Sequence, residues 1–349
     1  MVKYARPYLE DAYFPIGLYD APRSALGELA AAGFNTVVNA DKDDPAYLAE
    51  CQSLGIRLIP YVNLERIQKD VEKAGDDFTI WAWYLFDEPD LNKREPAFIE
   101  TNFHAVKKAD PSRPVYLTVW SPRRYADFIE FCDIFAPNPY PIVSADARKN
   151  QLRLVGYAVD AARRLAREQP VWAIIQAFWA KPWWQRNPMP EELRAMVYLA
   201  LNHGAKGIVY FSYKSGDRPL TQHEDLFGMV RRLNDEMTEL KPWLVVESEE
   251  GAVSPELLAD DRGGIVIGRP MLSPVDCAVR RIGGRRILMV VNPDPWGKNI
   301  KLHFPEGSAK VSNVIEIFAD KADSLEIRNN CIPLRFEPFQ VRIFQIRFP

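Results

Sequence analysis

The chain has few cysteines and few histidines, and neither kind is grouped. The 349 residues hold four of each. The cysteines, which include no CxxC pair, are Cys51, Cys132, Cys277 and Cys331. Such spacing favours buried thiols over a disulfide framework or a zinc site, and the dispersed histidines argue against a histidine-based metal centre. We therefore expect neither a metal nor a cofactor.

Long apolar runs and a large net charge are also missing. No apolar stretch reaches the ~18 residues that span a membrane, so no membrane partner is expected. The N-terminal residues lack the apolar segment of a signal peptide, which predicts a cytoplasmic location for the chain as given; a trimmed N-terminus would leave secretion open. A formal net charge of -3 does not indicate a nucleic-acid partner. No pattern specifies an oligomeric state.

The chain does have a regular alternation of strand-like and helix-like segments. The expected strands cover residues 14–20, 34–39, 56–61, 81–87, 114–120, 133–136, 171–176 and 207–211. The expected helices cover residues 22–32, 45–54, 64–75, 95–109, 123–131, 144–168, 190–203 and 224–240. This order predicts an α/β fold, a (β/α)8 TIM barrel over residues 1–243. A doubly wound sheet is less favoured because no glycine-rich phosphate loop follows a strand.

After Pro242 the helical periodicity ends and short β-rich runs appear between turn signals. These runs cover residues 264–268, 277–282, 287–292, 313–318 and 341–346. Pairs such as Gly283-Gly284 and Asn329-Asn330 separate them. We expect a small C-terminal antiparallel β-sandwich over residues 244–349, which is a normal domain size.

The fourth expected strand ends in two adjacent carboxylates, Asp87 and Glu88, followed by Pro89. Proline cannot donate a ladder hydrogen bond, so the strand should stop there. In α/β barrels the carboxyl end of a strand is the end that carries the chemistry. The competing interpretation is that these residues only begin the next helix.

The other expected strand ends contribute polar, acidic and aromatic side chains. The candidate substrate-binding residues are Asp20, Asn39, Trp120, Asn138, Tyr140, Gln176, Trp179, Tyr213 and Asp217. These positions include no lysine or arginine clamp, which disfavours a phosphate substrate. Carboxylates that protonate a leaving oxygen, amides that bind hydroxyls and aromatic faces that pack on sugar rings are typical of glycoside hydrolysis.

On these residues the barrel resembles the (β/α)8 glycoside hydrolases of clan A. Those enzymes carry an acid/base glutamate at the end of strand four, usually in Asn-Glu-Pro, where this chain has Asp87-Glu88-Pro89. The resemblance implies a hydrolase of an oligo- or polysaccharide with Glu88 as general acid/base. The β-sandwich resembles an accessory domain of that superfamily. A general acid needs a raised pKa, and Trp83, Phe86 and Asp87 are the candidate perturbers of Glu88.

One departure from that group leaves the mechanism open, because strand seven ends in Gln176 and not in a nucleophilic glutamate. First, as in hexosaminidases with an Asp-Glu pair, Asp87 would orient a 2-acetamido group of the substrate. Both side chains reach one site only if the strand is irregular there. Second, Asp20 or Asp217 would act as base or nucleophile. Third, the protein would be a non-catalytic carbohydrate-binding barrel.

Overall fold

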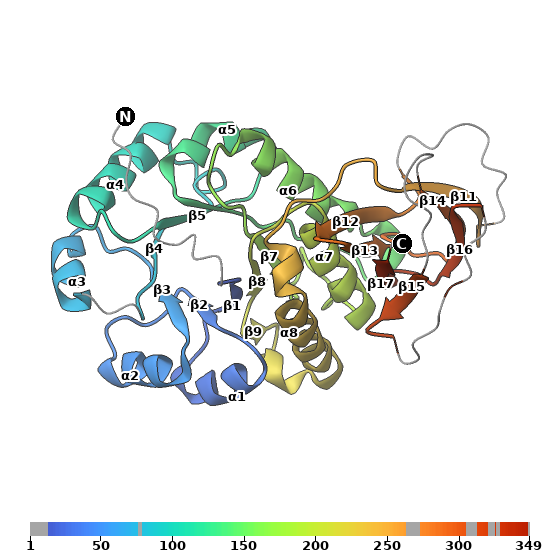
Figure 1. Ribbon diagram of the computed structural model, residues 1–349. Coiled ribbons are helices and arrows are strands. Elements are labelled where there is room, and N and C mark those ends of the chain that lie inside the picture. The colour runs from blue at the N-terminus through green and yellow to red at the C-terminus, as the bar shows by residue number, and fades with distance from the viewer. Residues whose placement is uncertain are drawn as a thin grey trace.

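The computed structural model describes residues 13–75, 79–262, 273–304, 313–319, 325 and 329–347. Within them, eight parallel strands are ringed by helices (Figure 1). The strands are β1 Ile16–Tyr19, β2 Thr36–Val38, β3 Arg57–Ile59, β4 Trp83–Asp87, β5 Val115–Val119, β6 Ile134–Pro137, β7 Ala173–Gln176 and β8 Ile208–Phe211. The helices are α1 Leu26–Ala31, α2 Pro45–Leu54, α3 Ile67–Ala74, α4 Pro96–Ala109, α5 Tyr125–Phe128, α6 Arg153–Leu165, α7 Pro190–Asn202 and α8 Glu224–Leu244.

The strands close into a barrel in chain order. Two continuous sheets run β3-β2-β1-β8-β7 and β4-β5-β6. Parallel bridges join them, Leu58 to Ile80 and Tyr61 to Tyr84 on one side, and Phe135 to Val171 on the other. Because the strands are parallel, their carboxyl ends meet at one mouth, and β4 and β8 lie on opposite sides of it. No helix in the described part of the chain is long and apolar enough to cross a membrane.

Most expected helices form, and in one of them the capping signals act at both ends. In α2, the Asp44 side chain accepts the N–H of Ala46 at 2.9 Å, and Gly55 ends the helix at φ 69°. The expected helix over 144–168 is wrong in its first part, since α6 begins only at Arg153. Here the Asn150 Oδ1 atom accepts the N–H groups of Val143 and Ser144, which builds a turn in place of a helix.

The barrel interior is filled mainly by apolar and aromatic side chains, and some of them carry hydroxyls. Tyr19, Tyr84 and Tyr116 point inward from β1, β4 and β5 and are fully or nearly buried. The hydroxyls of Tyr19 and Tyr116 are 3.0 Å apart, and those of Tyr84 and Thr118 are 2.7 Å apart. This hydrogen-bonded layer lies where β4 and β5 approach the mouth, so it supports the residues at the end of β4.

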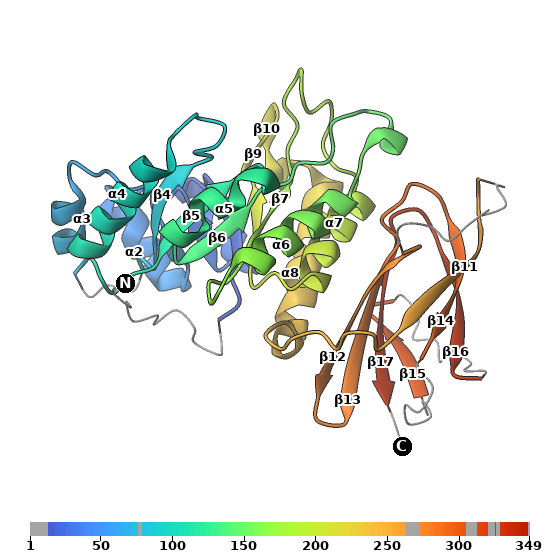
Figure 2. The same ribbon diagram turned by 90° about the horizontal axis from the view of Figure 1, so that it is seen from above.

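The C-terminal strands of the described residues form two antiparallel sheets beside the barrel (Figure 2). One sheet holds β12 Asp276–Ile282, β13 Arg285–Val291, β17 Val341–Arg347 and β15 Asn313–Ile317; the other holds β11 Ser254–Asp260, β14 Lys298–His303 and β16 Cys331–Phe336. Apolar residues of both sheets share one core. The predicted fold class, a TIM barrel followed by a β-sandwich, is confirmed. The expected run 264–268 lies outside the described residues, and β11, β14 and β16 were not anticipated.

The sandwich packs against α7 and α8 through the outer face of its four-stranded sheet. Met289, Val291 and Ile343 of that face belong to the same buried cluster as residues of both helices. His203, at the end of α7, contacts Asp160 and Asp276 at 2.8 Å each, and these two carboxylates raise its pKa to about 10 in spite of burial, which alone would lower it. A charged, hydrogen-bonded histidine therefore links the barrel to the sandwich.

Candidate active site

A bulge in β4 directs the paired carboxylates toward the mouth. Tyr84 pairs with β5 in regular register, but the next paired residue is Phe86, so Leu85 is an extra residue. Leu85 and Phe86 both pack on the outer, helix-facing cluster, whereas Tyr84 faces the barrel interior. Asp87, three residues after Tyr84, consequently lies on the same face of the strand as Tyr84. The side chains of the two residues form a hydrogen bond.

The backbone reverses direction directly after the bulge. Glu88 has φ 45°, a left-handed conformation that is uncommon for a residue with a side chain and that concentrates at functional sites. The Asn92 amide donates to the carbonyl oxygens of Asp87 and Glu88 at 2.9 and 3.1 Å. Asp90 accepts the N–H groups of Trp120 and Ser121. These contacts hold the irregular segment, and both carboxylates line one cavity.

Two hydroxyls fix the carboxylate of Asp87. The Tyr84 hydroxyl donates to Oδ1 at 2.5 Å, and the Thr118 hydroxyl donates to the same oxygen at 3.1 Å. The Asp87 N–H donates to the Tyr61 hydroxyl at 3.3 Å. Both hydroxyls bind Oδ1, and the second oxygen of the carboxylate, Oδ2, has no part in these contacts.

Glu88 has a raised pKa. Burial, the largest cause, raises the pKa of this carboxyl to about 7; a hydrogen bond donated by the Asn138 amide to Oε1 opposes the shift, and the charges of Asp87 and Asp90 add to it. Of the three expected perturbers, Asp87 is the one whose charge acts on Glu88. Trp83 donates to Asp110, and Phe86 packs against Phe98. A carboxyl with a pKa near 7 can both donate and accept a proton at neutral pH.

We expect Asn138→Ala to move the alkaline limb of the pH–rate profile to higher pH. The Asn138 amide stabilises the ionised form of Glu88, so its removal should raise the pKa of that carboxyl further. The measurement is kcat/KM against pH for the wild type and the variant. A limb that moves to lower pH would show that Asn138 does not act on Glu88 in this way.

The cavity has a volume of about 390 Å³ and is walled mainly by aromatic rings. Tyr140 packs on Phe178, Trp184 and Phe211, with ring centroids 5.0, 5.9 and 5.8 Å apart. Burial raises the pKa of Tyr140 well above its usual value, so its hydroxyl remains protonated. Flat apolar walls with a few convergent polar groups are suited to a small ring-shaped ligand.

The structure separates the candidate residues into two groups. Those that line the cavity are Asp87, Glu88, Asn138, Tyr140 and Trp179. Those that lie outside its lining are Asp20, Asn39, Trp120, Gln176, Tyr213 and Asp217. The second group therefore needs a role other than direct contact within this cavity.

Gln176 is a buried structural amide. Its Oε1 accepts the N–H of Ile142 at 2.9 Å, and its Nε2 donates to the carbonyl oxygens of Ile142 and Phe178. With these bonds it ties the segment after β6 to the segment after β7. The residue that occupies the end of β7 thus supports the walls of the cavity and has no free group for chemistry.

Asp20 and Asn39 form a pair at the ends of β1 and β2. The Asn39 amide donates to Asp20 Oδ1 at 2.7 Å, and both residues have left-handed backbones. Burial raises the pKa of Asp20, the Asn39 bond opposes this, and the charge of Asp87 adds to it. Asp20 is thus close enough to Asp87 to interact with it electrostatically.

Sequence reasoning missed several residues of the lining. They are Tyr19, Thr118, Ile174, Phe178, Ala180, Phe211, Ser212, Lys214 and Gly216. Thr118 could have been found, because a threonine hydroxyl in the mainly apolar run of β5 has to find a partner when it is buried. Lys214 and Gly216 belong to a hairpin after β8 whose position no local pattern specifies.

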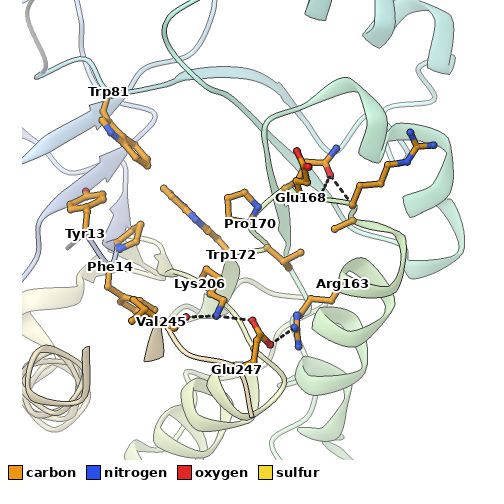
Figure 3. Close-up of a pocket in the computed structure, with 16 residues that line it drawn as sticks. Tyr13, Phe14, Trp81, Arg163, Glu168, Pro170, Trp172, Lys206, Val245 and Glu247 are labelled. Atoms are coloured by element: carbon orange, nitrogen blue, oxygen red, sulfur yellow. Dashed lines mark hydrogen bonds and ion pairs between the residues drawn. The ribbon is translucent and has the colours of Figure 1, made fainter. Parts of the chain in front are cut away.

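A second cavity, of about 360 Å³, lies at the opposite end of the barrel, where the strands begin (Figure 3). Trp81 and Trp172 stack within its lining, with centroids 5.5 Å apart. Glu247 pairs with Arg163 at 2.6 Å and with Lys206 at 3.0 Å, so these charges compensate one another. The described residues of the chain contain no cluster of three or more possible metal ligands at either end. The cavity at the carboxyl ends is therefore the candidate active site.

Comparison with known proteins finds similar chains among carbohydrate-active enzymes that share the barrel fold. Residues 79–241 match the β-galactosidase family model. No curated protein matches. An α-amylase from Geobacillus thermoleovorans, solved with acarbose, is similar with a TM-score of 0.60 at 11% identity, covering 93% of this chain and 91% of that one. A family 5 glycoside hydrolase from Bacteroides vulgatus is similar with a TM-score of 0.60 at 10% identity, covering 96% and 89%.

A family 30 xylanase from Clostridium acetobutylicum is also similar, with a TM-score of 0.54 at 11% identity over 96% of this chain and 95% of that one. Identities this low establish the shared fold alone. The family-model match adds that the segment from β4 to α8, which contains Asp87 and Glu88, is similar to a β-galactosidase family. The predicted resemblance to (β/α)8 glycoside hydrolases and the predicted enzyme class are thereby confirmed.

Proposed function

We propose that the barrel, residues 1–243, hydrolyses a glycosidic bond in an oligo- or polysaccharide, with Glu88 as general acid/base and residues 244–349 as an accessory domain. One observation carries this proposal: Glu88, whose burial raises its pKa to about 7, lies beside Asp87 in an aromatic-walled cavity. Glycoside hydrolysis needs a carboxyl group that is still protonated near neutral pH and an ionised partner beside it.

The lining favours a mechanism in which the substrate supplies the nucleophile. Asp87 and Glu88 are the only carboxylates among the described lining residues, and the end of β7 provides a buried amide. In this mechanism the carbonyl oxygen of a 2-acetamido group forms a bond to the anomeric carbon. Asp87, held by Tyr84 and Thr118, accepts a hydrogen bond from the acetamido N–H and orients that oxygen.

Glu88 moves the proton in both half-reactions. It first gives its proton to the glycosidic oxygen, whose bond to the anomeric carbon breaks as the acetamido oxygen attacks. The leaving sugar departs as an alcohol, and an oxazolinium ring remains. Glu88, now ionised, then takes a proton from water, whose oxygen attacks the anomeric carbon and reopens the ring. The carboxyl is protonated again at the end of the cycle, and no cofactor is needed.

A second route would use Asp20 as base or nucleophile. The observation in its favour is the electrostatic interaction of Asp20 with Asp87 at the same mouth. Against it, Asp20 is bonded to Asn39 and lies outside the lining of the cavity. Asp217 is exposed in the hairpin after β8 and also lies outside the lining.

Release of an aryl group from glycosides with and without a 2-acetamido group tests the proposal. Cleavage of the acetamido substrates alone, lost in Glu88→Gln, is the expected result. Cleavage of plain glycosides, lost in Asp20→Asn, would instead support the second route. Absence of cleavage over a broad panel of sugars, with binding retained, would show a non-catalytic carbohydrate-binding barrel.

Asp87→Asn is expected to lower kcat on a 2-acetamido glycoside by about 10²-fold or more. A misplaced reacting group commonly costs this much. The NH2 group of an asparagine cannot accept the hydrogen bonds that the Tyr84 and Thr118 hydroxyls now donate to Asp87, so the side chain would be held less well. The measurement is steady-state kinetics, with Asp235→Asn as the control, because Asp235 is an exposed acid on α8. Equal rates for Asp87→Asn and the wild type would remove Asp87 from the mechanism.

A further inference from the structure

The hairpin after β8 forms one wall of the candidate active site. Its strands are β9 Lys214–Ser215 and β10 Arg218–Pro219. Lys214 and Gly216 line the cavity, whereas Ser215, between them, points the other way, as strand alternation requires. The buried Ser215 hydroxyl lies 2.7 Å from the carbonyl oxygen of Ala177 and 2.9 Å from Asn187 Oδ1, which anchors the hairpin to the segment after β7.

A second anchor lies at the turn of the hairpin. Gly216 has φ 74°, and a Cβ atom at this position would lie 2.0 Å from the indole nitrogen of Trp179. The indole thus rests directly on the glycine backbone, where only glycine leaves room for it. The Ser212 hydroxyl also donates to the carbonyl oxygen of Lys214 at 3.0 Å. The backbone of Lys214 is therefore held from both sides, and Lys214, which is exposed to solvent, contributes to the lining of the cavity.

Lys214 is the one cationic residue in the described lining of this cavity. No carboxylate of the described residues lies within ion-pair distance of its ammonium group, whereas Lys107 pairs with Asp133 and Lys206 pairs with Glu247. The catalytic carboxylates follow β4, which lies across the barrel from β8. A ligand held between the two walls would meet Asp87 and Glu88 on one side and an unpaired ammonium group on the other.

The size of the cavity limits which part of a ligand can reach Lys214. A volume of about 390 Å³ is near the lower end of ligand pockets, which span about 300–1,000 Å³. Such a space holds about one substituted sugar ring. Because Lys214 and Glu88 line this one cavity, we take the group that contacts Lys214 to belong to the same ring whose glycosidic bond lies at Glu88.

We propose that Lys214 binds an anionic substituent, a carboxylate or a sulfate, on the sugar ring bound in this cavity, so that the substrate is an acidic glycan. This inference rests on the proposed function. An ammonium group that offers hydrogen bonds to an anion makes a charge-assisted contact, and a neutral ring would leave it without a partner. The lining thus separates two tasks: the β4 side acts on the glycosidic bond, and the β8 side selects the charged ring.

The test compares three aryl 2-acetamido glycosides: a neutral one, its 6-sulfate and its 6-carboxylate. The wild type should prefer one of the two charged rings, and that preference identifies the source of the charge. In Lys214→Met, kcat/KM for the preferred ring should fall by about 10- to 100-fold, the usual range for a lost hydrogen bond to a charged group, with a much smaller fall for the neutral ring. Lys214→Arg should retain most of the preference.

The control is Lys108→Met, which removes an exposed lysine on the outer helix α4 and should leave all three rates unchanged. A wild type without preference for either charged ring, or equal losses on charged and neutral rings in Lys214→Met, would overturn the inference and leave the proposed function standing. If no glycoside is cleaved, the proposed function fails, and calorimetric binding of the three free sugars to Glu88→Gln decides the inference separately. The inference is supported if a charged sugar binds more tightly than the neutral one, and if this difference is weakened by salt and lost in Glu88→Gln/Lys214→Met. Equal binding of the three sugars overturns the inference.

Discussion

Replacement of Glu88 by glutamine is expected to lower the rate of glycoside cleavage by about 10²- to 10⁴-fold, the range that general acid catalysis contributes. Glutamine keeps the shape of the side chain and can still contact Asn138, but it has no proton to give to the leaving oxygen. The loss should be largest for a poor leaving group, such as a sugar alcohol, and smaller for an aryl group that departs without protonation. Steady-state kinetics on both kinds of substrate measures the difference.

The pH profile provides a second readout of the same substitution. Since the pKa of Glu88 is raised to about 7, wild-type activity should fall as the pH rises through 7 and Glu88 loses its proton. The residual activity of Glu88→Gln should not show this alkaline limb. A variant that retains the wild-type limb would indicate that another group is the acid.

The free energy of unfolding of Glu88→Gln shows whether a loss of activity in this variant comes from misfolding. Between the ordinary glutamate pKa of 4.5 and the folded value of about 7, the folded protein keeps a proton that the unfolded chain has released. The unfolded state then binds fewer protons, so the Glu88 carboxyl lowers the free energy of unfolding as the pH rises through this range. Glu88→Gln should lack this decline and be at least as stable as the wild type at pH 7. Loss of activity together with loss of the folded state would not support a catalytic role.

Replacement of Arg280 by methionine is expected to lower the free energy of unfolding by about 3–5 kcal/mol, as for a buried charged network that loses one partner. Arg280 lies on β12 and is only 1% exposed. Its guanidinium donates to the carbonyl oxygens of Trp243, Leu244 and Val246 at the end of α8 and of Leu201 at the end of α7. Without these donors, helix-end carbonyls would remain buried and unpaired.

Arg281→Met is the matched control for this prediction. Arg281 follows Arg280 on the same strand, is exposed, and approaches Glu249 only at 3.9 Å. Exposed pairs of this kind contribute at most about 1 kcal/mol. Urea unfolding followed by tryptophan fluorescence should therefore separate the two variants clearly. Equal destabilisation by both would mean that the helix-end bonds of Arg280 do not hold the sandwich on the barrel.

Burial lowers the pKa of Arg280 to about 10, which still leaves the guanidinium protonated at neutral pH. The arginine of one domain thus satisfies the C-terminal carbonyls of two helices of the other, where the helix dipoles also favour a positive charge. A cation from the sandwich thus binds the carbonyl oxygens at two helix ends. Without the sandwich, these helix ends of the barrel would be exposed to water.

Local sequence patterns are enough to predict the order of the elements and the place of the paired carboxylates. Alternating β-rich and helix-periodic segments, with glycines after helices, specify eight β/α units because these signals are local. Pro89 ends β4 because proline cannot donate to the ladder, which places Asp87 and Glu88 at the carboxyl end of a barrel strand. Parallel strands then direct all such ends to one mouth, so the general location of the candidate site follows from chain order alone.

Which strand-end side chains meet there depends on the folded chain and does not follow from local patterns. The bulge at Leu85 and the left-handed backbone of Glu88 turn two consecutive residues toward one cavity, and neither follows from residue type. The polar side chain of Gln176 forms its hydrogen bonds with neighbouring backbone groups. Lys214 lies in the lining of the cavity because Ser215 anchors its hairpin. Direction and contact depend on register and on partners distant in the chain, and local patterns carry no information about either.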